Sequence, residues 1–145
     1  MNEFELLGAK ALAVSGWREG RRVAVDRDRV AYLADGYEWS ELVEALLAEF
    51  GGLSFGKRYG DFGDVLTVDA ALAISGIYKD RVEEYEEFLN LKLLPVGVAA
   101  RGVLTVMVSP DGTFRGGYDD GLDYLGASFR EALGRLTLGP GRKLR

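Results

Sequence analysis

The sequence predicts an α+β domain, in which a central and mostly antiparallel sheet is flanked by N-terminal helices and one C-terminal helix. Two observations predict this class. Helical periodicity dominates the first 50 residues and returns near the C-terminus, whereas short apolar runs separated by turn residues fill most of the region from 92 to 118. This order favours segregated helices and strands over the strict alternation of a doubly wound parallel sheet. With no repeat or linker, we expect one domain over residues 1–139 and a flexible basic tail over 140–145.

Three helices are expected before residue 51. The first covers 4–15, the second begins with Asp26 as its N-cap and stops at Gly36, and the third covers 39–50. Each has apolar side chains at helical spacing, which predicts one face toward the core. These side chains are Phe4, Leu7, Ala11 and Val14 in the first helix, Val30 and Leu33 in the second, and Leu42, Val43, Leu46, Leu47 and Phe50 in the third.

The middle of the chain mixes strands with short helices. Residues 51–63 contain five glycines and predict a strand and a loop, followed by a strand over 65–68. Asp69 is expected to cap one or two helical turns over 70–75. A longer helix over 80–89 divides into two faces. The apolar face holds Val82, Tyr85, Phe88 and Leu89, and the solvent face holds Glu83, Glu84, Glu86 and Glu87.

The last third predicts strands and then a helix. Pro95 cannot donate to a ladder, so the strand over 93–98 is expected to lie at an edge of the sheet or to start just past the proline. The apolar run 103–108 is typical of a strand that is covered on both faces. The turn residues 110–112 lead into 113–115 and predict a hairpin. Ser128 opens a final helix with capping-box spacing, and its apolar stripe is Phe129, Leu133 and Leu136.

The 145 residues include no histidine and no cysteine. This excludes Ser/His and Cys/His nucleophile pairs, zinc and iron–sulfur sites built from these residues, and disulfides. No apolar run approaches the roughly 20 residues of a membrane span. The acidic start, Met1 to Glu5, lacks the basic segment of a secretory signal, so we expect a cytoplasmic location.

Negative charge is concentrated in the middle of the chain. Residues 1–58 carry 8 basic and 10 acidic groups (8 − 10 = −2), residues 59–124 carry 5 and 12 (5 − 12 = −7), and residues 125–145 carry 5 and 1 (5 − 1 = +4), which sums to −5. Such a region repels nucleic acid and anionic membranes and favours cationic ligands or a basic protein partner. The alternative is that the acidic residues only keep the protein soluble. Basic residues beside aromatic rings, as in Trp17-Arg18, leave single-stranded nucleic acid as a weaker alternative.

Three motifs come close to known sites and are rejected. Residues 51–57 have the spacing of a phosphate-binding loop, but Arg58 replaces the Ser or Thr that would bind magnesium, and the segment follows a helix instead of a strand. A calcium loop that starts at Asp119 would need a glutamate where Arg130 stands. Glu83 and Glu87 lie one turn apart, yet on a solvent face, where no cleft would shift their pKa values for hydrolysis.

Several short motifs together carry a family resemblance. They are Gly16-Trp17, Gly20-Arg21, Phe50-Gly51-Gly52-Leu53, Val68-Asp69, Pro95-Val96-Gly97, Asp111-Gly112, Leu125-Gly126, Ala132-Leu133 and Leu138-Gly139. In this order and spacing, over about residues 11–139, the chain resembles the third family of SUKH-superfamily immunity proteins. The resemblance implies an α+β domain without enzymatic activity. Such proteins are encoded beside polymorphic bacterial toxins, often nucleases or nucleic-acid deaminases, and neutralise the toxin inside the producing cell.

The resemblance and the charge pattern together predict a partner-binding surface with no catalytic residue, cofactor or metal. The expected partner is a basic toxin domain, not nucleic acid or a membrane. The candidate residues are Glu83, Glu84, Glu86, Glu87, Tyr118, Asp119, Asp120 and Asp123. Arg21 is a candidate partner for a buried carboxylate such as Asp69. Two alternatives stay open: a regulatory or scaffold domain of the same fold that binds a host protein, and a hydrolase that uses carboxylates alone.

Overall fold

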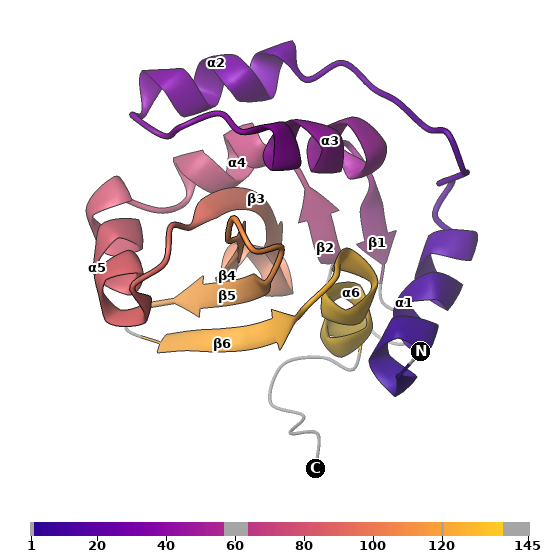
Figure 1. Ribbon diagram of the computed structural model, residues 1–145. Coiled ribbons are helices and arrows are strands. Elements are labelled where there is room, and N and C mark those ends of the chain that lie inside the picture. Colours follow the sequence, from indigo (N-terminus) through magenta and orange to yellow (C-terminus); the bar gives the residue numbers. More distant parts are fainter. Residues whose placement is uncertain (1, 57–63, 120, 138–145) are drawn as a thin grey trace.

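The computed structural model describes residues 2–56, 64–119 and 121–137 (Figure 1). The glycine-rich segment 57–63 and the tail 140–145, for which the sequence predicts a loop and a flexible end, lie outside this part. The elements are α1 (Glu3–Ala13), α2 (Asp26–Ala34), α3 (Glu41–Phe50), β1 (Ser54–Gly56), β2 (Asp64–Val68), α4 (Ala70–Ser75), α5 (Lys79–Leu89), β3 (Leu94–Ala99), the 3-10 turn η1 (Ala100–Gly102), β4 (Leu104–Val108), β5 (Phe114–Tyr118), β6 (Gly121–Gly126) and α6 (Phe129–Thr137).

The strands form one six-stranded sheet in the order β1-β2-β3-β4-β5-β6, and every neighbouring pair is antiparallel. Figure 1 shows α2, α3 and α4 on one side of the sheet, α5 at one end, and α6 with α1 at the other. This arrangement confirms the predicted α+β class. The expected hairpin is β4–β5, in which Val108 pairs with Phe114.

Two strands differ from the sequence-based expectation. The prediction that Pro95 marks an edge is wrong, since β3 lies in the middle of the sheet. The missing N–H of Pro95 is tolerated for two reasons. Strand β2 pairs with β3 only as far as Gly97, so Pro95 lies beyond the end of β2. On the other side, the register between β3 and β4 shifts between Pro95 and Gly97. Strand β6 is not predicted from the sequence; it is an edge strand with exposed Asp123 and Tyr124. Its few inward side chains leave almost no alternation to detect.

Helix boundaries follow local capping. Ser40 and Asp69 accept hydrogen bonds from the backbone N–H groups of Val43 (3.2 Å) and Leu72 (3.0 Å), as the prediction for Asp69 requires. In α2 the expectation is wrong: Asp26 is the first helical residue, and Val25 occupies the N-cap position without a side-chain bond.

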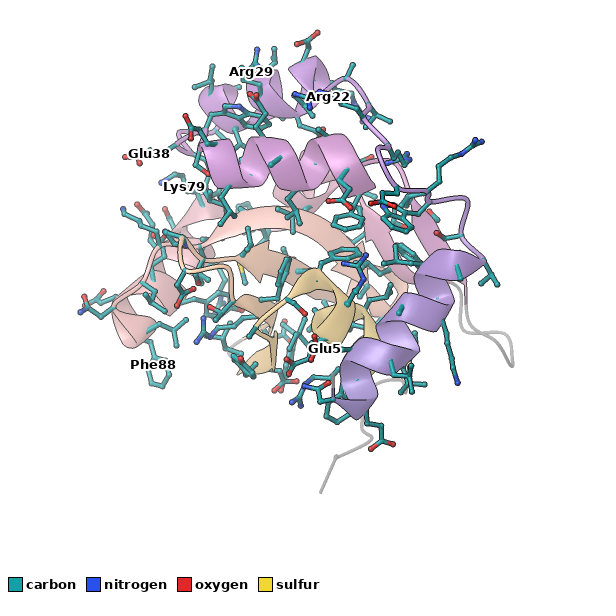
Figure 2. The ribbon with its side chains drawn as sticks, turned by 45° about the vertical axis from the view of Figure 1, so that its right-hand side comes forward. Glu5, Arg22, Arg29, Glu38, Lys79 and Phe88 are labelled. Carbon is teal, nitrogen blue, oxygen red and sulfur yellow. The ribbon has the colours of Figure 1, made fainter. Side chains whose placement is uncertain are left out.

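Four side chains that were expected in the core are exposed instead: Val14 (86%), Val30 (66%), Leu33 (62%) and Phe88 (83%). Val14 lies past the end of α1, and α2 faces the body of the protein through Tyr32, whose hydroxyl donates to the Pro95 carbonyl (2.5 Å). Phe88 projects from α5 into solvent (Figure 2). The inward face of α5 is narrower than predicted, because Val82 and Tyr85 alone are buried in this helix.

The core is centred on the ring of Phe129 at the start of α6. This ring stacks on Phe50 of α3, with centroids 4.0 Å apart and planes 11° apart. It also contacts Phe55 of β1 at 6.1 Å and Phe114 of β5 at 6.0 Å. One aromatic side chain therefore joins the C-terminal helix to strands β1 and β5 of the sheet and to α3.

The two terminal helices cross at backbone contact. Gly8 of α1 and Gly134 of α6 are both buried, and no side chain fits at either position. A Cβ at Gly8 would overlap the backbone of Arg130, and one at Gly134 would overlap the backbone of Phe4. The close crossing thus depends on glycine at both positions, although glycine weakens an isolated helix.

Replacing either glycine by alanine tests this crossing. On an exposed helix the change would add stability, but Gly8→Ala and Gly134→Ala should each lower the free energy of unfolding by about 1–3 kcal/mol because the helices must move apart. Urea denaturation measures the change. Gly76→Ala is the control, since its Cβ would lie 3.7 Å from the nearest atoms. A gain in stability at Gly8 or Gly134 would contradict the crossing.

Candidate functional site

The glutamates of α5 do not share one environment. Glu83 pairs with Lys79 (3.3 Å) and Glu84 with Arg81 (3.5 Å), and both carboxylates remain more than half exposed. Glu87 is also exposed. Glu86 differs from the expected solvent orientation: it is half-buried, and its carboxylate accepts a hydrogen bond from the Leu93 N–H (2.8 Å). It therefore fixes the segment that leads from α5 into β3.

The second predicted group lies at the turn between β5 and β6. Tyr118 is 38% exposed, and its hydroxyl donates to the Asp123 carboxylate at 3.4 Å. Asp119 is exposed and has a φ of +45°, a left-handed conformation that aspartate adopts more readily than most residues. Asp120 lies outside the described residues. The turn thus presents one aromatic ring next to two exposed carboxylates.

Tyr85 joins these two groups. Its side chain crosses from α5 to the turn, and its hydroxyl donates to the Asp119 backbone carbonyl at 2.7 Å. The ring lies on Gly117 of β5, where an added Cβ would be 2.6 Å from Tyr85 Cε2. The α5 carboxylates and the β5–β6 turn, more than 30 residues apart in sequence, are therefore adjacent. We call them together the acidic surface: Glu83, Glu84, Glu87, Tyr118, Asp119 and Asp123.

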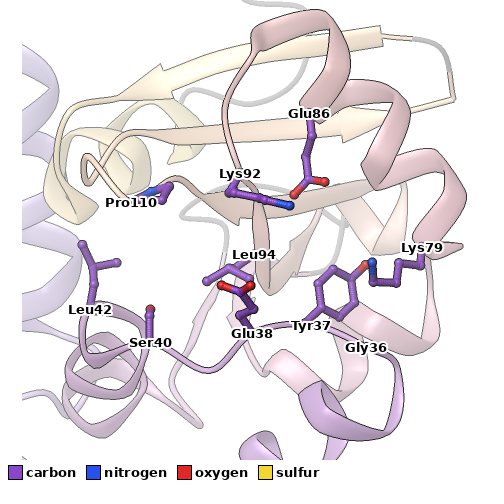
Figure 3. Close-up of a pocket in the computed structure, with 10 residues that line it drawn as sticks. All are labelled: Gly36, Tyr37, Glu38, Ser40, Leu42, Lys79, Glu86, Lys92, Leu94 and Pro110. Atoms are coloured by element: carbon purple, nitrogen blue, oxygen red, sulfur yellow. The ribbon is translucent and has the colours of Figure 1, made fainter.

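A cavity of about 330 Å³ opens on the other flank of α5 (Figure 3). Its walls come from the α2–α3 loop, the start of α3, α5, the start of β3 and the β4–β5 turn. They are formed by Gly36, Tyr37, Glu38, Ser40, Leu42, Lys79, Glu86, Lys92, Leu94 and Pro110. Sequence reasoning missed this site, because the five segments meet only in the folded chain and Gly36 was interpreted simply as a helix stop.

Arg21 has a structural role that differs from the sequence expectation. Its guanidinium donates to the backbone carbonyls of Glu49 (2.7 Å) and Gly51 (2.9 Å), at the C-terminal end of α3. A cation is favourable there, because the last carbonyls of a helix lack partners and carry partial negative charge. The suggested pairing with Asp69 is therefore wrong, and Asp69 pairs with Arg27 instead (3.5 Å).

The described residues contain no cluster of three or more carboxylates arranged to hold a metal ion. Within the same part of the chain, none of the helices has the length and apolar character needed to cross a membrane.

Comparison with protein families decides what kind of protein carries these features. The model of the SUKH-3 immunity protein family matches residues 7–139. The chain belongs to the SUKH-3 immunity protein family. The match spans all six strands and α2 to α6. Among the curated proteins, none matches this chain in sequence.

Membership establishes the general role. A SUKH-3 immunity protein neutralises a cognate toxin, so this chain acts by binding a protein partner and not by catalysis. This role accords with a surface of exposed carboxylates and aromatic rings, and it disfavours both the carboxylate-only hydrolase and the host scaffold that the sequence left open.

The Tyr85 hydroxyl can be tested by Tyr85→Phe, which keeps the ring and removes the bond to Asp119. We expect a loss of about 1 kcal/mol in the free energy of unfolding and roughly fivefold faster hydrogen exchange at the β5–β6 turn. Hydrogen exchange followed by mass spectrometry measures the effect. Tyr124→Phe, on the neighbouring strand, is the control for loss of an exposed hydroxyl. Unchanged exchange at the turn would show that Tyr85 does not hold it.

Proposed function

We propose that this SUKH-3 protein neutralises a toxin that acts on nucleic acid, a nuclease or a deaminase, by covering its cationic active site or substrate groove. The observation that carries the proposal is the acidic surface, in which Tyr85 holds two carboxylate-bearing segments together. Asp120 is included in the proposed binding surface because of its position in the sequence, and Glu86 borders the acidic surface from the cavity side. We place the action in the cytoplasm of the producing cell, where the toxin would otherwise meet its substrate.

Electrostatics support this choice of partner. An enzyme that binds nucleic acid must offer lysine and arginine side chains to the phosphates. Carboxylates on an inhibitor mimic that negative charge and speed the encounter by long-range attraction. In this chain the net charge of residues 59–124 is 5 − 12 = −7, and this segment includes both halves of the acidic surface.

Exposed aromatic rings supply the second element of a binding surface. Phe88 is 83% exposed and lies one helical turn after Glu84 on α5. Tyr118 contributes a ring at the β5–β6 turn. Exposed aromatic side chains on a charged surface commonly mark protein interfaces, where they contribute a large share of the binding energy. We expect Phe88 and Tyr118 to be the apolar anchors between the carboxylates.

A competition experiment tests the type of toxin. The toxin encoded beside this gene, made catalytically inactive, is bound to short labelled DNA and RNA oligonucleotides, and the immunity protein is then added. We expect the immunity protein to displace the bound DNA or RNA stoichiometrically, because the immunity protein and the nucleic acid occupy the same cationic surface of the toxin. A toxin that binds neither oligonucleotide, or a stable complex of all three molecules, would overturn the proposal.

Charge reversal tests the acidic surface. Glu84→Lys combined with Glu87→Lys should reduce the rate of toxin association roughly tenfold at low salt and flatten its dependence on salt. Glu86 is kept, because it holds the Leu93 backbone. Stopped-flow fluorescence measures the rate.

The matched control is Glu3→Lys with Glu19→Lys, which makes the same change in net charge away from α5. If both double variants slow association equally, net charge alone would explain the effect. The acidic surface would then have no special role in the encounter.

A further inference from the structure

The cavity beside α5 combines apolar walls with polar groups. Leu42, Leu94 and Pro110 provide the apolar side, and Glu38 and Glu86 bring carboxylates from opposite walls (Figure 3). At about 330 Å³ the cavity can hold a large side chain of a partner. We call it the Tyr37 pocket.

Tyr37 is the unusual member of this wall. It is only 6% exposed, and its hydroxyl is buried without a hydrogen-bond partner in the described part of the chain. Buried hydroxyls are nearly always paired, because an unpaired one loses its bonds to water and gains nothing in return. The Lys79 ammonium lies 5.2 Å from the centroid of the Tyr37 ring and is itself paired with Glu83. Within the described residues, the Tyr37 hydroxyl therefore has hydrogen-bonding capacity that no protein group uses.

The charges around Tyr37 favour a cation. Burial raises the pKa of the Tyr37 hydroxyl first, and the carboxylates of Asp35, Glu86 and Glu83 raise it further. All three carboxylates disfavour a negative charge at this position, so they equally favour a positive one. Glu83 is paired with Lys79, so these two charges offset each other and Asp35 and Glu86 remain as the carboxylates that favour a cation, while Lys92 is exposed at the rim as a competing cation.

We propose that the Tyr37 pocket receives an arginine side chain of the toxin. The guanidinium donates to the carboxylates of Glu38 and Glu86, and its methylene groups pack against Leu42 and Leu94. Arginine fits better than lysine, because its planar fork donates in several directions at once, as two carboxylates on opposite walls require. The Tyr37 hydroxyl oxygen becomes a third acceptor when the Lys79 side chain moves aside, which gives up its ion pair with Glu83 and its contact with the Tyr37 ring.

The inference rests on the proposed function only for the identity of the protein that supplies the arginine. The pocket lies on one flank of α5 and the acidic surface on the other, so one toxin that covers α5 can contact both. Lys92 occupies the rim as a competing cation; Figure 3 shows its side chain extending toward Glu86. The proposal therefore requires opposite effects from the two rim residues: loss of Glu38 weakens binding, and loss of Lys92 strengthens it.

Titration of the full chain with N-acetyl-arginine amide tests the pocket without any toxin. Amide resonances of residues 36–38 and 92–94 should shift in an NMR titration, with a millimolar dissociation constant. Glu38→Gln should weaken binding roughly fivefold and Lys92→Gln should tighten it roughly twofold. Glu41→Gln and Lys10→Gln make the same charge changes outside the pocket and should leave the constant unchanged.

N-acetyl-norleucine amide and N-acetyl-glutamate amide are the comparison ligands. Shifts that are equal for arginine and norleucine, or larger for glutamate, would overturn the proposal. The proposal would also be overturned if Glu38→Gln and Lys92→Gln both weakened, or both strengthened, the binding of the arginine ligand. These outcomes do not depend on the class of toxin. Oligonucleotide displacement without arginine binding would reject the pocket alone. Arginine binding without oligonucleotide displacement would reject the nucleic-acid target alone.

Discussion

The ring of Phe129 holds the fold together. It stacks on Phe50 and contacts Phe55 and Phe114, so α6 is fixed to α3 and to strands β1 and β5. The glycine crossing then brings α1 against the outer side of α6. Packing interactions thus concentrate at the end of the sheet where the two terminal helices meet. The opposite end of the sheet holds α5 and the β5–β6 turn (Figure 1), and the acidic surface lies there.

Two tyrosines define the two flanks of α5. The Tyr85 hydroxyl has a hydrogen-bond partner: it donates to the Asp119 carbonyl and holds the β5–β6 turn against the helix. The Tyr37 hydroxyl is buried and finds no hydrogen-bond partner among the described residues, and it lies beside a cavity with carboxylates on its walls. In an immunity protein these two arrangements are complementary. A fixed acidic surface favours rapid encounter with a basic toxin, and a pocket with unused acceptors favours slow dissociation.

Local signals in the sequence predicted much of the fold. Asp69 and the glycines after helices marked element ends, the turn at 110–112 marked the hairpin, and the spacing of short motifs identified the family. Long-range features were not accessible in this way. The edge strand β6 has little periodicity, and Glu86 matches its neighbours in sequence although it bonds inward. The Tyr37 pocket needs five separated segments, so no local pattern could indicate it.

The central claim is that the toxin binds the end of the molecule that carries α5. The most direct measurement is hydrogen exchange of the immunity protein, alone and in complex with its cognate toxin. The account predicts new protection in α5, in the β5–β6 turn and in the α2–α3 loop, with no change in α1 or α6. Protection confined to α1 and α6 would contradict it.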